Sequence, residues 1–164
     1  PGLTMRMGEA FRSAFEEEGV RDVNKIVTVE SSGIAPALAT AAAFGVPLVF
    51  AKKSRPRTMP DALEARAPSP TRGGEVILHV SPHYLQPDER VLIVDDFLAS
   101  GKTVQALVQL VQSAGAELQG AGFVIEKSFQ GGRDALATLR VPLVSLARIR
   151  ELRGDEVIFE DEPG

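Results

Sequence analysis

The sequence predicts an α/β fold, in which a mainly parallel central sheet is flanked by helices. Short apolar segments of strand length alternate along the chain with longer segments whose apolar residues recur at helical spacing. Most of the strand segments are apolar throughout, as is typical of strands covered on both faces. With 164 residues, the chain is expected to form a single domain spanning residues 1–164.

Four segments are expected to be helical. Apolar residues fall at helical spacing in residues 3–18, and Gly19 follows as a helix end. The alanine-rich residues 34–44 carry Pro36 in the first turn and Gly45 just past the end, which is the usual asymmetry of helix termini. The other two helices are a segment that contains Val104, Leu107, Val108 and Val111 and closes at Gly115, and the short segment 131–139.

The remaining apolar segments are expected to be strands. They are residues 25–29, 47–51, 75–80, 90–94, 120–126, a final central strand at 141–149 and a small strand at 156–160. Residues 52–74 hold four prolines and many charges without sustained apolar periodicity, so we expect a long, mobile excursion there.

The composition excludes several classes of protein. The chain has no cysteine, which excludes disulfides, thiolate metal sites and a cysteine nucleophile, and permits a cytoplasmic location. The net charge of −4 argues against a general nucleic-acid binder. No apolar run approaches the ~20 residues that a membrane-spanning helix needs. His79 and His83 lack metal-ligand spacing and are interpreted as structural or surface residues.

The strand at 90–94 leads directly into Asp95 and Asp96, and a small-residue loop then opens a helix. In open α/β sheets, ligands bind beyond the carboxyl ends of the strands. The backbone N–H groups of this loop, the hydroxyls of Ser100 and Thr103 and the helix dipole converge on one point, which favours a phosphate. Neighbouring carboxylates are suited to a vicinal diol or a cation, so the segment predicts a site for a sugar phosphate with a metal.

Three other interpretations of this segment compete with a sugar-phosphate site. The letters GKT resemble the end of a nucleotide-binding P-loop, but that motif requires glycine at position 96, where this chain has Asp96. The two acids are also compatible with a phosphorylatable acidic pocket, or with a solvated strand end.

The pattern of apolar strand, Asp-Asp, two apolar residues, small residue, Ser/Thr, Gly, any residue and Thr resembles the ribose-phosphate motif of the type I phosphoribosyltransferases. The segments VESSGIAPA, GVPLVFAKK, VIEKSFQGGRD and SLARI follow in the order found in the bacterial xanthine phosphoribosyltransferases, to which the chain is most similar from residue 1 to about 150. The resemblance implies the type I phosphoribosyltransferase fold. It also implies transfer of the 5-phosphoribosyl group from phosphoribosyl pyrophosphate (PRPP) to a 6-oxopurine in purine salvage, with xanthine favoured over guanine and hypoxanthine. Mg²⁺ would be held mainly through PRPP.

The resemblance also assigns roles to residues of the PRPP site. Asp95 and Asp96 would hold the ribose hydroxyls and support the positive charge that develops on the ribose, while Glu30 would help to orient metal-bound water. The 5′-phosphate would be held by Ala99, Ser100, Gly101, Lys102 and Thr103. The pyrophosphate loop would consist of Glu30, Ser31, Ser32 and Gly33. One or two residues of a separate basic segment, Lys52, Lys53 and Arg55, would also bind the pyrophosphate, with Lys52 and Lys53 favoured. Taken alone, Ser31 or Ser32 is equally compatible with a helix N-cap, and the basic residues with a solvated loop.

Lys127 and Phe129 match the purine-recognition segment of these relatives. A lysine ammonium suits the carbonyl oxygen of a 6-oxopurine and disfavours adenine, whose amine is itself a donor. The alternatives are a snorkelling surface lysine and a phenylalanine packed in the core.

The resemblance leaves three further expectations. A symmetric homodimer is expected, because in relatives the basic segment acts across an interface, and residues 52–74 would form a flexible lid that excludes water. Residues 1–15 match the helix that follows the N-terminal hood of relatives, so the hood is expected to be absent from this chain. The alternative functions are a non-catalytic PRPP-sensing domain of a purine-responsive transcriptional regulator and an adenine phosphoribosyltransferase.

Overall fold

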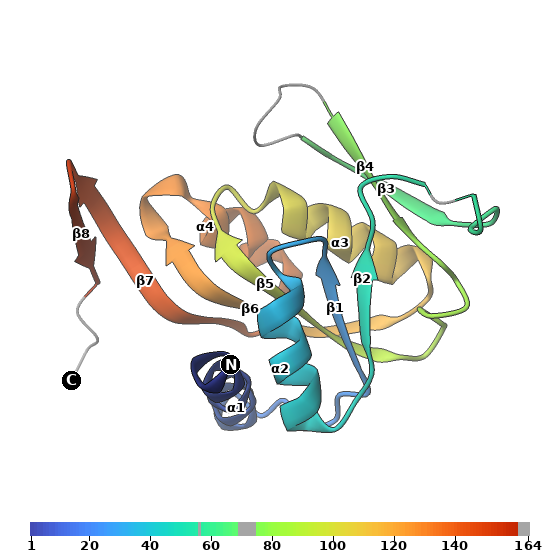
Figure 1. Cartoon of the computed structure of the whole chain (residues 1–164), viewed down its shortest axis with the longest axis horizontal. Helices are drawn as coiled ribbons and strands as arrows, with labels where there is room; N and C mark the ends of the chain where they lie inside the picture. The colour runs from blue at the N-terminus through green and yellow to red at the C-terminus, as the bar shows by residue number, and fades with distance from the viewer. Residues whose placement is uncertain (56, 69–74, 161–164) are drawn as a thin grey trace.

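The computed structural model describes residues 1–55, 57–68 and 75–160, and its core is a six-stranded sheet in the order β2-β1-β5-β6-β7-β8 (Figure 1). The strands of this sheet are β1 (Lys25–Val29), β2 (Leu48–Ala51), β5 (Arg90–Leu98), β6 (Glu117–Lys127), β7 (Leu143–Arg153) and β8 (Glu156–Phe159). All neighbouring pairs are parallel except β7 with β8, which is antiparallel. The prediction of a mainly parallel sheet is confirmed.

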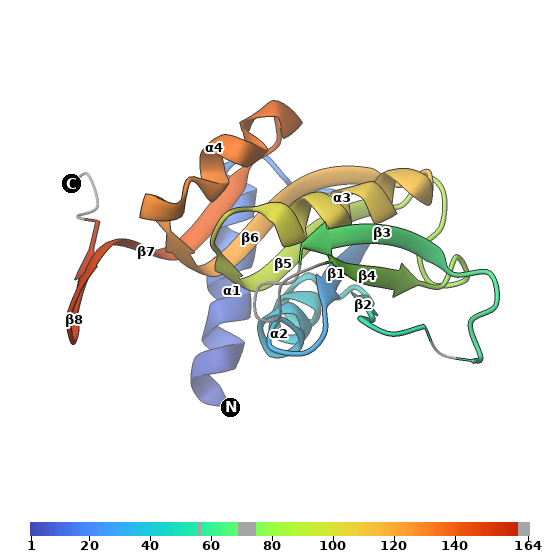
Figure 2. The ribbon, with the colours of Figure 1, turned by 90° about the horizontal axis from the view of Figure 1, so that it is seen from above.

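Helices cover both faces of the sheet, as expected. The α-helices are α1 (Gly2–Glu17), α2 (Ile34–Phe44), α3 (Lys102–Ser113) and α4 (Gly132–Leu136), with 3₁₀ turns at Ser128–Gln130 and Ala137–Leu139. Figure 2 shows α1 and α2 on one face and α3 and α4 on the other. None of the helices in the described ranges is both long and apolar enough to cross a lipid bilayer.

On the face of the sheet that α1 covers, two glycines leave space for aromatic side chains. Phe11 and Phe15 of α1 are fully buried against the sheet. A Cβ on Gly122 of β6 would lie 2.9 Å from the Phe11 ring, and one on Gly120 would lie 2.8 Å from the Phe15 ring. Since β-strands normally disfavour glycine, these two positions are explained by the space that the aromatic rings occupy.

The structure corrects the expectation for the segment between β2 and β5. Part of the predicted excursion is a strand, β3 (Leu63–Pro68), which pairs with β4 (Glu75–Val80) in a separate antiparallel sheet. The strand predicted at 75–80 therefore exists but does not join the central sheet. Leu78 of β4 and Ala65 of β3 pack into the same core as α3. Residue 56 and residues 69–74 of the predicted lid lie outside the described residues.

The second correction concerns the length of β5. The strand continues through Leu98 instead of ending at Val94, because Asp95, Phe97 and Leu98 pair with β6. Asp95 and Asp96 therefore lie within β5, with Asp96 two residues before its end at Leu98.

Candidate active site

A cavity of about 310 Å³ lies at the carboxyl ends of β1 and β5, in the region predicted for the ligand. The residues that line it come from five different segments of the chain. They are Val29, Glu30, Ser32, Lys53, Val76, Leu78, Asp95, Asp96, Phe97, Ala99, Thr103 and Lys127. The fold thus brings together the Asp-Asp pair, the loop before α3, the loop after β1, the basic segment and the lysine of β6.

Asp95 and Asp96 both line the cavity, but their environments differ. Asp95 is only 5% exposed, whereas Asp96 is partly exposed. The backbone N–H of Asp96 donates to Asp95 Oδ1 at 2.9 Å. Burial raises the pKa of Asp95 to about 8, and a side-chain hydrogen bond with Asp96 and the charge of Asp96 act in the same direction, against the backbone N–H and the charge of Lys53. Repulsion between the two acids is therefore relieved near neutral pH because Asp95 is largely protonated.

Gly33 is required beside Asp95 for reasons of space. Its backbone is ordinary right-handed helical, with φ −68°. A Cβ there would lie 2.4 Å from Asp95 Oδ1 and 2.3 Å from Thr28 Oγ1. Thr28 is fully buried, and its hydroxyl finds no hydrogen-bond partner among the described residues. The loop after β1 thus runs directly over the buried aspartate.

The loop before α3 has the geometry of a phosphate cradle. Gly101 has φ +79° and precedes the helix, a left-handed conformation that favours glycine. No described side chain caps the helix, so the first-turn N–H groups have no side-chain acceptor. Ala99 and Thr103 line the cavity, whereas Ser100 and Lys102 are exposed and lie outside its lining.

The loop after β1 is tied to the basic segment. The backbone N–H of Lys53 donates to Glu30 Oε1 at 2.6 Å, and the Glu30 N–H donates to the carbonyl oxygen of Ala51 at 3.0 Å. The peptide bond between Glu30 and Ser31 is cis. Ser32 lines the cavity and Ser31 is exposed outside its lining.

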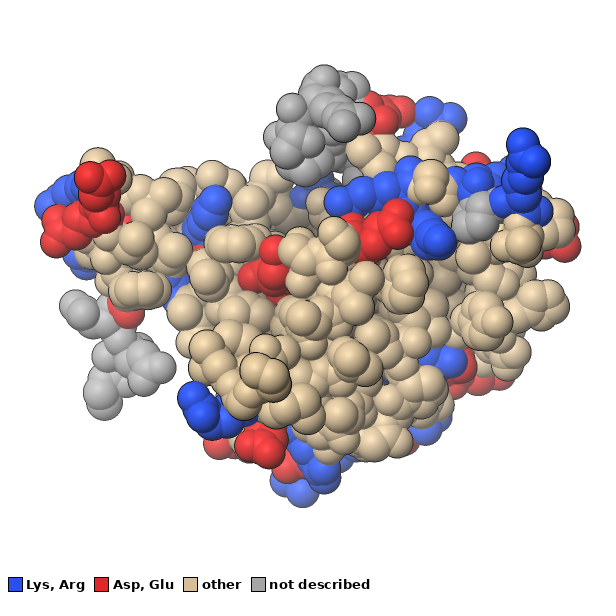
Figure 3. All heavy atoms as spheres, in the orientation of Figure 1, with Lys and Arg blue, Asp and Glu red and all other residues tan. Residues whose placement is uncertain are grey.

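The basic residues divide into one that lines the cavity and two that do not. Lys53 lines it. Lys52 lines a separate hollow beside β2, and its backbone pairs with His79. The Arg55 guanidinium donates to the carbonyl oxygens of Met59 and Pro60 and is therefore engaged within its own loop. Figure 3 shows Lys and Arg side chains gathered over the segment after β2 and around β3 and β4.

Of the two residues predicted to recognise a purine, Lys127 lines the cavity and Phe129 does not. The Lys127 ammonium lies 5.0 Å from the centre of the Phe97 ring, and both residues line the cavity. Phe129 is 50% exposed and is not part of the lining, nor is it in the core. Phe97, by contrast, was missed in the sequence, where it counted only as one of the two apolar residues after Asp95 and Asp96.

Val76 and Leu78 were missed as well, because they come from a strand that was expected in the central sheet and lies in a separate one. They supply an apolar wall to the cavity. The only signal for them was the apolar character of the segment 75–80, which does not distinguish a wall residue from a core residue.

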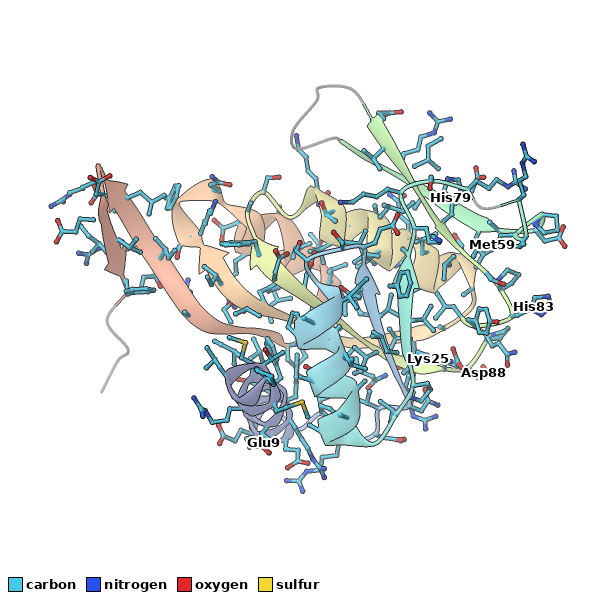
Figure 4. The ribbon with its side chains drawn as sticks, in the orientation of Figure 1. Glu9, Lys25, Met59, His79, His83 and Asp88 are labelled. Atoms are coloured by element: carbon cyan, nitrogen blue, oxygen red, sulfur yellow. The ribbon has the colours of Figure 1, made fainter. Side chains whose placement is uncertain are left out.

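The histidines behave as expected from the sequence. His79 is buried on β4, and its Nδ1 lies 3.3 Å from Glu64 Oε1, whereas His83 is exposed on the following loop (Figure 4). Among the described residues, no group of three or more His, Cys, Asp or Glu side chains is arranged to hold a metal ion by itself. Asp95, Asp96 and Glu30 offer oxygen donors around the cavity, and such donors suit Mg²⁺ when the substrate supplies further ligands.

Comparison with known proteins agrees with this geometry. The family model for the phosphoribosyl transferase domain matches residues 2–137. A xanthine phosphoribosyltransferase of Deinococcus deserti is 50% identical over 157 residues, which is 95% of this chain and 79% of the relative. One from Bacillus licheniformis is 47% identical over 165 residues, covering 100% of this chain and 84% of the relative.

The solved structures most similar in shape include adenine phosphoribosyltransferases. The enzyme of Saccharomyces cerevisiae, solved with an imino-altritol bisphosphate and adenine, has a TM-score of 0.77 and 28% identity, over 89% of this chain and 80% of that one. The enzyme of Giardia lamblia has a TM-score of 0.79 at 22% identity, over 92% of this chain and 82% of that one. Sequence and structure therefore lead to one conclusion: the chain belongs to the phosphoribosyltransferase family.

Proposed function

We propose that the protein is a purine phosphoribosyltransferase that transfers the 5-phosphoribosyl group of PRPP to a 6-oxopurine, with xanthine favoured, for purine salvage. The observation that carries the proposal is the single cavity in which Asp95, Asp96, the loop before α3 and Lys127 meet. The relatives at 47–50% identity, each named xanthine phosphoribosyltransferase, support the choice of base. We place the reaction in the cytoplasm, in keeping with a chain that has no cysteine.

PRPP is proposed to span the cavity from the loop before α3 to the loop after β1. The 5′-phosphate binds the backbone N–H groups at 99–103 and the Thr103 hydroxyl. The ribose hydroxyls donate to the carboxylates of Asp95 and Asp96. The pyrophosphate lies toward residues 30–33 and Lys53, whose ammonium balances its charge.

The reaction replaces one bond at the ribose C1′ atom by another. The bond from C1′ to the pyrophosphate oxygen breaks, and its electron pair leaves with pyrophosphate. A ring nitrogen of the purine forms the new bond to C1′, and the proton of that nitrogen passes to solvent. Because positive charge develops on the ribose, the carboxylates of Asp95 and Asp96 stabilise the transition state. Mg²⁺, when bound with PRPP, supplies charge neutralisation to the departing pyrophosphate.

The base is proposed to lie beside Lys127. Its ammonium donates to the 6-oxo group, whereas the amine of adenine would face it with another donor. The apolar residues Phe97, Val76 and Leu78 border the same space and limit the access of water to the reacting ribose. We propose that β3 and β4 act as part of the lid.

We further propose a homodimer. The hollow beside the edge strand β2 has a volume of about 260 Å³, and it is lined by Leu48, Val49, Phe50, Lys52, Met59 and Tyr84. Phe50 is 40% and Tyr84 is 64% exposed. Exposed aromatic side chains around such a hollow suit a second copy of the chain.

Pyrophosphate release tests the proposal. The protein is incubated with PRPP and Mg²⁺ together with xanthine, guanine, hypoxanthine or adenine, supplied separately, and an Asp95→Asn/Asp96→Asn variant is run in parallel. We expect turnover with xanthine that is lost in the variant. PRPP binding without turnover of any base would contradict the proposal and favour a PRPP sensor.

Adenine is the second candidate base. The adenine phosphoribosyltransferases similar in shape, at 26–28% identity over 89–90% of this chain for two of them, are the observation in its favour. The same assay decides between the bases, because turnover with adenine alone would contradict the role given to Lys127.

A further inference from the structure

Glu126 is the residue immediately before Lys127, and its side chain is almost completely buried. Its carboxylate accepts hydrogen bonds from Arg133, with Nε 3.0 Å from Oε1 and Nη2 2.6 Å from Oε2. The Ser145 hydroxyl donates to Oε2 at 2.6 Å. A buried carboxylate with donors on both oxygens is held in one orientation.

The charges of this group stabilise one another. Burial by itself raises the pKa of Glu126, but the hydrogen bonds from Arg133 and Ser145 and the charges of Arg133 and Arg148 lower it below its ordinary value. The hydrogen bond to Glu126 raises the pKa of Arg133 in turn. Each member of the pair therefore stabilises the ionised form of the other.

Arg133 belongs to α4, and α4 supports the loop before α3. A Cβ on Gly132 would lie 2.2 Å from the carbonyl oxygen of Ala99. A Cβ on Gly101 would lie 3.3 Å from Leu136 Cγ. The loop before α3, called the phosphate loop below (residues 99–103), thus rests directly on the backbone of α4, and a shift of α4 would move it.

The pair of Glu126 and Arg133 is also attached to β7, the strand beside β6, which carries Lys127. Arg133 Nη1 donates to the carbonyl oxygen of Leu143 at 3.0 Å, which attaches α4 to β7. The Ser128 hydroxyl donates to the carbonyl oxygen of Ile149 at 3.3 Å, so the residue after Lys127 is attached to β7 as well. The segment that carries Lys127 and the helix beneath the loop before α3 are therefore both attached to β7.

We propose that Glu126 and Arg133 are positioning residues that fix the distance between Lys127 and the phosphate loop, so that a purine nucleotide is held at both ends. Neither residue lines the cavity, and both act through their neighbours. This inference rests on the proposed function, because it takes Lys127 as the base contact and residues 99–103 as the phosphate contact.

The test compares a ligand that touches one end of the site with a ligand that touches both. Dissociation constants for ribose 5-phosphate and for xanthosine 5′-monophosphate are measured by calorimetry on the wild-type protein and on Arg133→Lys, which keeps the charge and loses the fork of donors. We expect nucleotide binding to weaken roughly five- to fiftyfold, and ribose 5-phosphate binding to change by less than about threefold.

The matched control is Arg148→Lys. Arg148 Nε lies 3.2 Å from Glu126 Oε2 and its Nη2 donates to Oε1 at 3.4 Å, but Arg148 belongs to β7, also pairs with Glu160, and does not attach Glu126 to α4. Both ligands should bind this variant within about twofold of the wild type. If Arg133→Lys does not fold, as judged by thermal unfolding, Ser145→Ala removes a single donor to Glu126 and should change nucleotide binding in the same direction by a smaller factor.

The outcomes separate this inference from the proposed function. Equal weakening of both ligands in Arg133→Lys, or the same selective loss in Arg148→Lys, overturns the positioning role and leaves the proposed function intact. A wild-type protein that binds ribose 5-phosphate but not the nucleotide overturns the assignment of the base site and this inference with it.

Discussion

At the scale of single residues, the main feature of the candidate site is the different environments of the adjacent residues Asp95 and Asp96. Asp95 is buried beneath Gly33 and next to the Thr28 hydroxyl, which has no hydrogen-bond partner among the described residues, whereas Asp96 is partly exposed on the same strand. The raised pKa of Asp95 means that the free protein holds a proton where the ribose hydroxyls are proposed to donate. An ionised carboxylate is the better acceptor, so we expect PRPP binding to release this proton.

The buried acid gives a prediction for stability against pH. Because the pKa of Asp95 is about 8 in the folded state and near 3.8 in the unfolded chain, the folded state binds the extra proton between these values. Its contribution to stability is fully present below about pH 4 and is lost as the pH rises towards 8. Asp95→Asn should therefore be more stable than the wild type at pH 8.5, by on the order of 1–3 kcal/mol, and the difference should vanish towards pH 4.

Urea unfolding of both proteins at pH 4.5, 6.5 and 8.5 checks this. An Asp61→Asn variant, changed at an exposed position, serves as the control and should follow the wild-type profile. A constant difference between Asp95→Asn and the wild type at all three pH values would show that Asp95 is not protonated in the folded protein.

Lys127 gives a prediction for specificity. Lys127→Gln removes a charged donor to the 6-oxo group, so kcat/KM with xanthine should fall on the order of 10- to 100-fold. The ratio of xanthine to adenine turnover should fall as well, since glutamine carries both a donor and an acceptor. Steady-state rates with each base check this, with Arg6→Gln on the exposed side of α1 as the charge-matched control. An unchanged ratio would leave Lys127 as a snorkelling side chain.

At the scale of secondary-structure elements, the predictability of a segment depends on how much of its structure is local. The segment from Asp95 to Thr103 could be predicted as a sugar-phosphate site because its residues are contiguous in the sequence. The strand β3 was missed because its sequence, LEARAP, holds one leucine and two alanines as its apolar residues besides proline, a weak signal for a strand. The role of Val76 follows only from the pairing of β3 with β4, which no local pattern indicates.

The contact between α4 and the phosphate loop gives a prediction for an element. A Cβ at position 132 would lie 2.2 Å from the Ala99 carbonyl oxygen, so Gly132→Ala should displace the loop from α4. We expect the affinity for PRPP to fall on the order of 10- to 100-fold, because small displacements of a binding loop are costly. Calorimetric titration with PRPP measures it. Gly2→Ala, where nothing lies within 4 Å, is the control, and an equal affinity in both variants would contradict the contact.

At the scale of the whole molecule, the sequence was sufficient for the α/β class and for many of the residues that line the cavity. The apolar strands and the glycine and proline signals at helix ends are properties of short segments, and they predicted the central sheet. Phe97 and the Glu126–Arg133 pair could not be predicted in the same way, because their roles depend on which segments meet in space. The contact between Phe129 and the base stays a prediction, because Phe129 is 50% exposed and lies outside the cavity lining.

The proposed homodimer gives the last prediction. If a second copy covers the hollow beside β2, Phe50→Glu places a charge in the interface and should convert the dimer to a monomer, as measured by sedimentation equilibrium. Phe159→Glu on β8 is the matched control, because Phe159 is 53% exposed but lies on the opposite edge of the sheet. Because the basic segment after β2 is expected to act across the interface, the monomeric variant should also lose turnover. A dimer that survives Phe50→Glu but dissociates in Phe159→Glu would instead place the interface at β8, and the basic segment would then act within its own chain.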